Sequence, residues 1–265
     1  MRYFQAFTLL IAFTLLLNGC VTSSTSTLSK KADPVAAVQR YVQLGLEYLK
    51  RGDVYRARER ITRALTINPE DASANAAFGL ISHQDGETEA AEASFLKAID
   101  SDKNYTRGRS YYAAFLFSEK RYQEALKHFE ISAEDTSYIS RAQIFTNIAL
   151  CNVKLSNYDA ALKAYQKTLR LDRSNGRALS GITELLIQEK DFKRAQQYYN
   201  HLVRLIRQQG LQHSAQSLWQ GIRIADYYQS YAQEASLVML LEKNYPDSNE
   251  YSQYLKREQA RKTDV

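Results

Sequence analysis

The chain has 265 residues, 45% of them hydrophobic and 24% charged, a balance that is ordinary for a folded protein. Only 10 Gly and 3 Pro occur, so long stretches contain neither breaker, which disfavours a turn-rich β architecture and favours helices. The formal net charge of +6 permits contact with anionic partners, but it does not by itself distinguish nucleic acid from lipid headgroups.

The first twenty residues have the pattern of a secretory signal. One cation, Arg2, precedes an apolar stretch that extends from Phe4 to Leu17. A helix of that length spans about 21 Å, which is short of the roughly 30 Å hydrocarbon core of a bilayer. An uncleaved signal anchor is the alternative, and the length argues against it.

The end of this segment, "LLLNGC", resembles the lipobox of bacterial lipoproteins at Leu17, Gly19 and Cys20. Asn18 departs from that pattern, which usually has a small residue there. The resemblance implies that residues 1–19 are removed. It also implies that Cys20 becomes the N-terminus, with diacylglycerol on its thiol and an acyl chain on its amino group. Several acyl chains make a durable membrane anchor.

Residues 20–33 are expected to be a flexible tether, because "VTSSTSTLSKKADP" has no aromatic and few apolar residues. Val21 follows the lipidated cysteine, and the resemblance to enterobacterial lipoproteins implies sorting to the outer membrane, with the protein facing the periplasm. Lipidation of Cys20 leaves Cys151 without a disulfide partner. We expect Cys151 to be a small buried apolar residue.

A pattern with a period near 34 residues follows the tether. Small residues recur at Ala57, Ala91, Ala125, Ala161, Ala195 and Ala235. In the first unit, "YVQLGLEYLKRGDVYRARERITRALTINP", Gly45 and Tyr48 precede the first of these alanines, and Ile61 and Ala64 follow it. This pattern resembles the tetratricopeptide repeat, in which each unit is a pair of antiparallel helices.

The resemblance implies an all-α fold, a right-handed superhelical solenoid of about six helix-turn-helix repeats that fills residues 34–265. The repeats are expected at about 38–71, 72–105, 106–139, 142–175, 176–209 and 216–249. Small residues allow the helices of a pair to approach closely. A single pair cannot bury its apolar face, so the units must stack.

Capping and turn residues occur where these repeat boundaries require them. Asp33 and Pro34 are suited to the N-cap and first turn of the array, and Gly52 and Gly86 are suited to the turns within the first two repeats. The sixth repeat is the most degenerate. It is expected to place Trp219, Ile222, Ala235 and Met239 at core positions.

No catalytic or metal-binding motif is recognisable. The chain has no Gly-rich phosphate loop, no HExxH and no GxSxG. Its four histidines, His83, His128, His201 and His213, are far apart and lack metal-ligand spacing. We therefore expect no enzymatic activity, no metal, no small-molecule substrate and no cofactor other than the covalent lipid on Cys20.

The first helix of each unit should line a concave groove, and several groove positions are apolar. The predicted groove residues are Val42, Leu46, Leu49, Leu80, His83, Phe117, Leu150 and Val153. An apolar stripe of this kind suggests that an amphipathic helix or an extended apolar segment of a protein partner binds there. The alternative is that these residues only complete the packing between neighbouring first helices. Apolar Val42 and Leu46 argue against a carboxylate clamp of the chaperone-binding type, which uses Lys and Asn.

The first unit is also rich in cations. Lys50, Arg51, Arg56 and Arg60 are candidates for contact with anionic headgroups or with an acidic partner. The alternative is an ordinary solvated helix face.

The lipobox, the short tether and six repeats together resemble the PilF/PilW family, the pilotin lipoproteins of type IV pilus biogenesis. The resemblance spans the whole chain, including "NYPDSNEYSQYL" near its end. It implies an outer-membrane lipoprotein that binds the pilus secretin, PilQ, and helps it to localise and multimerise, without a nucleic-acid partner.

Two other roles for such lipoproteins stay open at this stage. One is that of a BamD-like subunit of the β-barrel assembly machine, and the other is that of an NlpI-like scaffold for peptidoglycan hydrolases. Both are binding roles, so the sequence alone does not separate them from the pilotin role.

Overall fold

The computed structural model describes residues 33–263, and this part of the chain consists of α-helices without a β-strand. The predicted signal segment, Cys20 and most of the tether lie outside the described residues. The helices are, in chain order, α2 (Pro34–Lys50), α3 (Val54–Ile67), α4 (Ala72–Gln84), α5 (Thr88–Ser101), α6 (Thr106–Ser118), α7 (Tyr122–Ala133), α8 (Arg141–Lys154), α9 (Tyr158–Leu171), α10 (Gly176–Gln188), α11 (Phe192–Gln208), α12 (Ala215–Tyr227), α13 (Tyr231–Asn244) and α14 (Asn249–Thr263).

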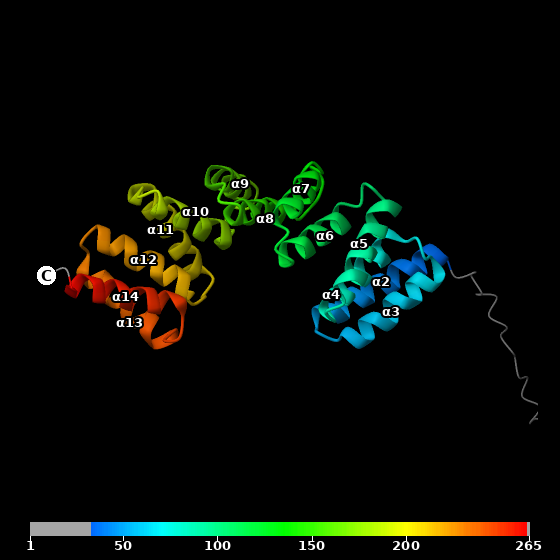
Figure 1. Ribbon diagram of the computed structural model, residues 1–265, viewed down its shortest axis with the longest axis horizontal. Helices are drawn as coiled ribbons and strands as arrows, with labels where there is room; N and C mark the ends of the chain where they lie inside the picture. The colour runs from blue at the N-terminus through cyan, green and yellow to red at the C-terminus, as the bar shows by residue number, and fades with distance from the viewer. Residues whose placement is uncertain (1–32, 264–265) are drawn as a thin grey trace, which may run out of the picture.

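Consecutive helices pack as six pairs, α2–α3 to α12–α13, and α14 follows the last pair. Figure 1 shows an arch with α2 and α3 (blue and cyan) at one end and α13 and α14 (orange and red) at the other. The first helices of most neighbouring pairs also contact each other, whereas the second helices of neighbouring pairs make at most isolated backbone contacts. The second helices are therefore splayed along the outer side of the arch. The predicted all-α solenoid of helix pairs is confirmed.

Small residues explain the close approach of paired helices. Ala57, Ala91, Ala125, Ala161 and Ala195 are all fully buried. Two glycines of the first helices pack equally tightly: a Cβ added at Gly45 would lie 2.5 Å from the side chain of Ile61, and one added at Gly79 would lie 2.8 Å from the ring of Phe95. A side chain at either position would therefore force the facing side chain or the paired helix to shift.

The turn inside each repeat ends the first helix in the same way. One residue per turn has a positive φ, and these residues are Gly52, Gly86, Lys120, Ser156, Lys190 and Gln229. In the first turn the N–H of Asp53 donates to the carbonyl of Tyr48 at 2.9 Å, which closes a Schellman-type cap. The second helix then begins at once, because Asp53 also accepts a hydrogen bond from the backbone N–H of Arg56. The expected roles of Gly52 and Gly86 are thus confirmed.

The predicted N-terminal cap and the predicted buried thiol are also found. The Asp33 carboxylate accepts a hydrogen bond from the N–H of Val35 at 3.0 Å, and Pro34 is the first residue of α2. Cys151 is a fully buried free cysteine, and burial raises the pKa of its thiol to about 12. The thiol therefore stays protonated and packs as a small apolar side chain.

The sixth pair differs from the prediction. Ala235 is exposed and Met239 is 67% exposed, so the expectation that they occupy core positions is wrong. The fourth residue of α13, which corresponds to the buried alanine in the second helix of the other repeats, is Glu234. Trp219 and Ile222 are buried as expected.

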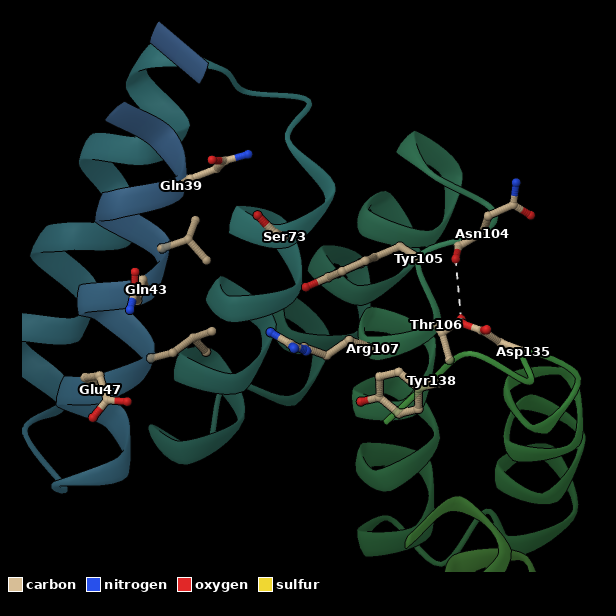
Figure 2. A pocket seen from close by; sticks show the side chains of 12 residues that line it. Gln39, Gln43, Glu47, Ser73, Asn104, Tyr105, Thr106, Arg107, Asp135 and Tyr138 are labelled. Carbon is tan, nitrogen blue, oxygen red and sulfur yellow. Dashed lines mark hydrogen bonds between the residues drawn. The ribbon is translucent and has the colours of Figure 1, made fainter. Parts of the chain in front are cut away.

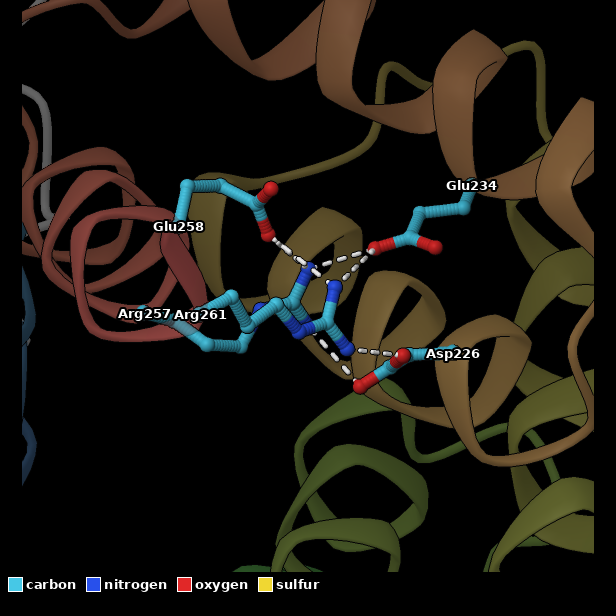
Figure 3. Close-up of polar contacts among 5 residues, drawn as sticks. All are labelled: Asp226, Glu234, Arg257, Glu258 and Arg261. Atoms are coloured by element: carbon cyan, nitrogen blue, oxygen red, sulfur yellow. Dashed lines mark hydrogen bonds and ion pairs between the residues drawn. The ribbon is translucent and has the colours of Figure 1, made fainter. Parts of the chain in front are cut away.

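Glu234 is tolerated at this position because α14 supplies cations (Figure 3). Arg257 donates to the carboxylate of Glu234 at 2.5 Å and to that of Asp226 at 3.3 Å. Its guanidinium also lies 5.4 Å from the ring centroid of Trp219. Arg261 contacts both Asp226 and Glu234. The last repeat is therefore closed by an ion-pair cluster between α12, α13 and α14 rather than by a small side chain.

Candidate partner-binding groove

The predicted groove residues lie on the first helices α2, α4, α6 and α8. Val42 is only 6% exposed and packs in the core formed by α2, α3 and α4. The other seven are half-buried: Leu46, Leu49, Leu80, His83, Phe117, Leu150 and Val153. The six apolar ones pack against a core cluster, and His83 packs against the buried ring of Phe115. These seven side chains thus combine packing with an accessible apolar surface.

Four of them share one hollow. Leu46 and Leu49 of α2 face Leu80 and His83 of α4 across a cavity of about 670 Å³. Its remaining lining residues are Glu47, Lys50, Gln84 and Tyr111. His83 is held in place from the third repeat, since its Nε2 lies 3.2 Å from the hydroxyl of Ser118 and its ring packs edge-on against Phe115 at 5.2 Å.

A second hollow of about 710 Å³ continues from the first, because both are lined by Leu46 and Glu47. Figure 2 shows Gln39 and Gln43 on the α2 side, with Tyr105, Arg107 and Tyr138 extending from the opposite side. Two further lining residues are joined on the side opposite α2, where the hydroxyl of Thr106 donates to the carboxylate of Asp135 at 2.7 Å. We call the two hollows together the N-terminal groove.

On the side opposite α2, the N-terminal groove has a polar wall formed by Tyr105, Arg107 and Tyr138. Arg107 is exposed and forms no ion pair with any described residue. Burial raises the pKa of Tyr105 to about 12, so its phenol remains a hydrogen-bond donor at neutral pH. The N-terminal groove can therefore hold apolar side chains at its α2–α4 end and polar groups beside Arg107.

Sequence reasoning missed the polar wall, although a signal for part of it exists. Gln39, Ser73 and Arg107 recur at an interval of 34 residues, and Gln39 and Ser73 are each seven positions before a predicted groove residue, Leu46 and Leu80. Extending the predicted groove by two turns towards the N-terminus of each first helix would have included these residues. Tyr105 and Tyr138 lie in connections between repeats, where the repeat pattern makes no prediction.

The remaining predicted residues do not join the N-terminal groove. Phe117 packs edge-on against Tyr122 at 5.2 Å. Leu150 lines a separate hollow of about 340 Å³ formed with the fifth repeat. Val153 packs at the margin of the core and lines neither hollow. The groove prediction therefore resolves into one continuous site on the first three repeats and three separate positions.

The cations of the first repeat are largely engaged with carboxylates. Arg56 lies 3.4 Å from Asp53, and Arg60 lies 3.8 Å from Glu59. Lys50 and Arg51 are exposed, and Lys50 borders the α2–α4 hollow. Arg58 pairs with two acidic residues of the next repeat, Asp85 and Glu87. The net positive potential of this face is thus smaller than its sequence suggests.

Across residues 33–263, no three His, Cys, Asp or Glu side chains are grouped so that they could hold a metal ion. Within the same residues, no helix combines the length and the apolar character needed to cross a bilayer.

Comparison with known proteins agrees with the helix pairs. Two family models described as tetratricopeptide repeat match residues 42–106 and residues 153–218. A crystal structure of PilW, described as a widely conserved type IV pilus biogenesis factor, superposes with a TM-score of 0.71 at 20% identity, covering 82% of this chain and 98% of PilW. At that identity the likeness concerns the fold.

A closer similarity extends along nearly the whole chain. The type IV pilus assembly protein PilF of Pseudomonas aeruginosa is 33% identical over 239 residues, which are 90% of this chain and 93% of PilF. A solved structure of Pseudomonas aeruginosa PilF superposes with a TM-score of 0.78, at 32% identity, over 84% of this chain and 99% of that structure. The chain therefore belongs to the tetratricopeptide-repeat family of the type IV pilus assembly protein PilF.

Proposed function

We propose that this protein is a pilotin, an outer-membrane lipoprotein that binds the secretin of the type IV pilus and promotes its localisation and multimerisation in the outer membrane. The observation that carries the proposal is the similarity to PilF, which extends over 90% of this chain. The lipobox pattern ending at Cys20 supports a lipid anchor and a periplasm-facing position. The same similarity favours a pilus role over a BamD-like or an NlpI-like role.

The mechanism is capture and escort rather than turnover. The N-terminal groove supplies a continuous surface on which an amphipathic helix or an extended segment of the secretin can bury apolar side chains against Leu46, Leu49 and Leu80. Lipid on Cys20 brings the bound secretin to the outer membrane. No step requires a bond to be made or broken in the partner.

Binding of the secretin to the N-terminal groove is tested with the two purified proteins. The double variant Leu46→Glu/Leu80→Glu places two carboxylates in the groove, and burying them against an apolar segment is unfavourable. We expect secretin binding to weaken at least about 100-fold, which corresponds to about 3 kcal/mol. Far-UV circular dichroism should stay unchanged and melting should remain cooperative, with a modestly lower midpoint, because both side chains are half-buried at the edge of the core.

Leu171→Glu is the matched control, because Leu171 is 46% exposed at the end of α9 and does not line the groove. It should bind secretin like the wild type. Retained binding by the double variant would contradict the groove as the docking site, and loss of its fold would show that Leu46 and Leu80 serve packing instead.

The anchor is tested separately with Cys20→Ala. This variant should bind secretin with unchanged affinity but fail to bring it to the outer membrane. Normal secretin localisation in this variant would contradict the role of the lipid.

A further inference from the structure

The positive charge of this protein is concentrated in the fourth and fifth repeats. Residues 142–209 contain eleven Lys and Arg against five Asp and Glu. That excess equals the formal net charge of the whole chain, which is +6. The formal charges of all other residues therefore sum to zero, and the net positive charge lies in the middle of the arch.

These cations are not neutralised by neighbours, in contrast to those of the first repeat. Among the described residues of 142–209, Arg194 is the one cation in an ion pair, with Asp191 and Glu189. One acid of this stretch, Glu184, is paired with Arg223 of the next repeat. Asp172 accepts hydrogen bonds from Ser174 and Asn175, which leave its negative charge in place. The unpaired cations among the described residues of these two repeats therefore outnumber the two carboxylates outside ion pairs, Asp159 and Asp172.

Part of this charge surrounds a pocket on the outer side of the array. A hollow of about 430 Å³ lies between α9 and α11 and is lined by Gln166, Leu169, Arg170, Arg173, Tyr198 and His201. No carboxylate lines it. Arg170 and Arg173 are exposed, whereas Leu169 and Tyr198 are half-buried against the core and provide an apolar base. Guanidinium groups above an apolar base suit a phosphate diester with its attached glycerol.

Further cations continue this surface along both helices. Lys163 is exposed two turns before Arg170 on α9, and Arg204 is exposed one turn after His201 on α11. Positive charge spread over two parallel helix faces fits an extended anionic plane better than a single acidic side chain.

We propose that the outer face of α9 and α11 binds the anionic phospholipid headgroups of a bilayer surface. This basic face consists of second helices, which are splayed along the outer side of the arch, so a flat surface can contact it at the middle repeats. The N-terminal groove is lined mainly by first helices and stays open to a protein partner in this orientation. The contact is separate from the lipid on Cys20 and does not depend on the secretin.

The test uses the chain from Val21 to Val265 without lipid, which retains every repeat. Its partitioning is measured by co-sedimentation with vesicles of phosphatidylcholine mixed with phosphatidylglycerol and with vesicles of phosphatidylcholine alone. We expect binding to the anionic vesicles only, and strong weakening of that binding at high salt, since exposed charges are screened.

Two triple variants with equal loss of charge locate the contact. Lys163→Gln/Arg170→Gln/Arg173→Gln should reduce partitioning roughly 100-fold, because each surface cation contributes about fivefold. Arg56→Gln/Arg60→Gln/Arg63→Gln in the first repeat should reduce it by less than about threefold, since those arginines already pair with Asp53 and Glu59. Both variants should keep the helical circular dichroism of the parent.

Three results would overturn the proposal. They are absence of wild-type binding to the anionic vesicles at low salt, equal losses in the two triple variants, and binding to soluble polyglutamate without binding to vesicles. The last result would assign the basic face to an acidic protein segment.

Discussion

Replacement of Glu234 by alanine distinguishes two explanations of how the last repeat is stabilised. Alanine is the residue found at the corresponding buried position of the other five repeats, so a packing argument alone predicts a neutral or stabilising change. The ion-pair cluster predicts the opposite. The side chain of Glu234 is 13% exposed and that of Arg257 is 20% exposed, and the two are joined by a hydrogen bond of 2.5 Å.

The expected loss is about 2 kcal/mol in the free energy of unfolding of the C-terminal end. A hydrogen bond between charged groups is worth about 1.5–3 kcal/mol, and loss of one partner of a fully buried ion pair costs about 3–5 kcal/mol. The value for Glu234→Ala lies in the lower range because Arg257 keeps its contacts with Asp226 and Glu258. Glu258→Ala is the control, with a loss below about 1 kcal/mol, because Glu258 is more exposed at 32%.

Trp219 makes this loss directly measurable. It is the one tryptophan of the chain, and Arg257 of α14 lies over its ring. In urea, the fluorescence transition of Glu234→Ala should move about 1 M lower, while most of the far-UV circular dichroism persists through it. An unchanged fluorescence midpoint, or an increase, would refute the ion-pair explanation.

Three further changes test other features of the fold. Lys190→Gly should raise the free energy of unfolding by about 0.5–1 kcal/mol in urea titrations, because Lys190 has a φ of 61° that glycine adopts without strain. Gly79→Ala should lower the free energy of unfolding by about 1–3 kcal/mol, because the added Cβ would lie 2.8 Å from the ring of Phe95. Gly176→Ala is the control and should not lower it, because its Cβ would meet no atom closer than 3.7 Å. Thermal melting compares the two variants. Burial lowers the pKa of His128. The contribution of neutral His128 to stability is therefore complete above the unfolded pKa near 6.5 and is lost as the pH falls below that value. Between about pH 7.5 and about pH 5, the urea midpoint of His128→Gln should fall by less than that of the wild type.

The helix pairs could be predicted because their cause is local. A fully buried alanine sits at the same place in five second helices, and that place tolerates almost no side chain. The requirement repeats with the unit, so it is visible as a period in the sequence. The caps at Asp33, Gly52 and Gly86 were predictable for the same reason, since each depends only on its own backbone geometry.

The sixth repeat was placed wrongly because its compensation comes from outside the repeat. A search for a small residue selects Ala235, which is one position after Glu234. One residue is a rotation of about 100° around a helix, so the predicted inward positions Ala235 and Met239 face solvent. The burial of Glu234 depends on its ion pair with Arg257 of α14, which lies outside the repeat and is not part of the repeat pattern.

The candidate site was predicted in part. Offsets within the repeat located Leu46, Leu49, Leu80 and His83, which share one hollow. The polar wall around Arg107 depends on how the third repeat curves back towards the first, which is a property of the stacked array rather than of one unit.

Charge was the least predictable property. Counting cations identifies a basic first repeat, but ion pairs with Asp53, Glu59, Asp85 and Glu87 engage most of its arginines. Pairing depends on side chains of the neighbouring helix and the next repeat. The basic face of α9 and α11 is distinguished by cations that form no ion pair with any described residue, and this requires the structure.

The proposed role of this protein is to promote assembly of the pilus secretin. Its most direct test is the amount of heat-resistant secretin multimer in outer-membrane fractions of a strain that lacks the gene, compared with the same strain complemented by the wild-type chain. The multimer should be lost in the deletion strain and restored by complementation. Normal multimer levels in the deletion strain would contradict the pilotin role.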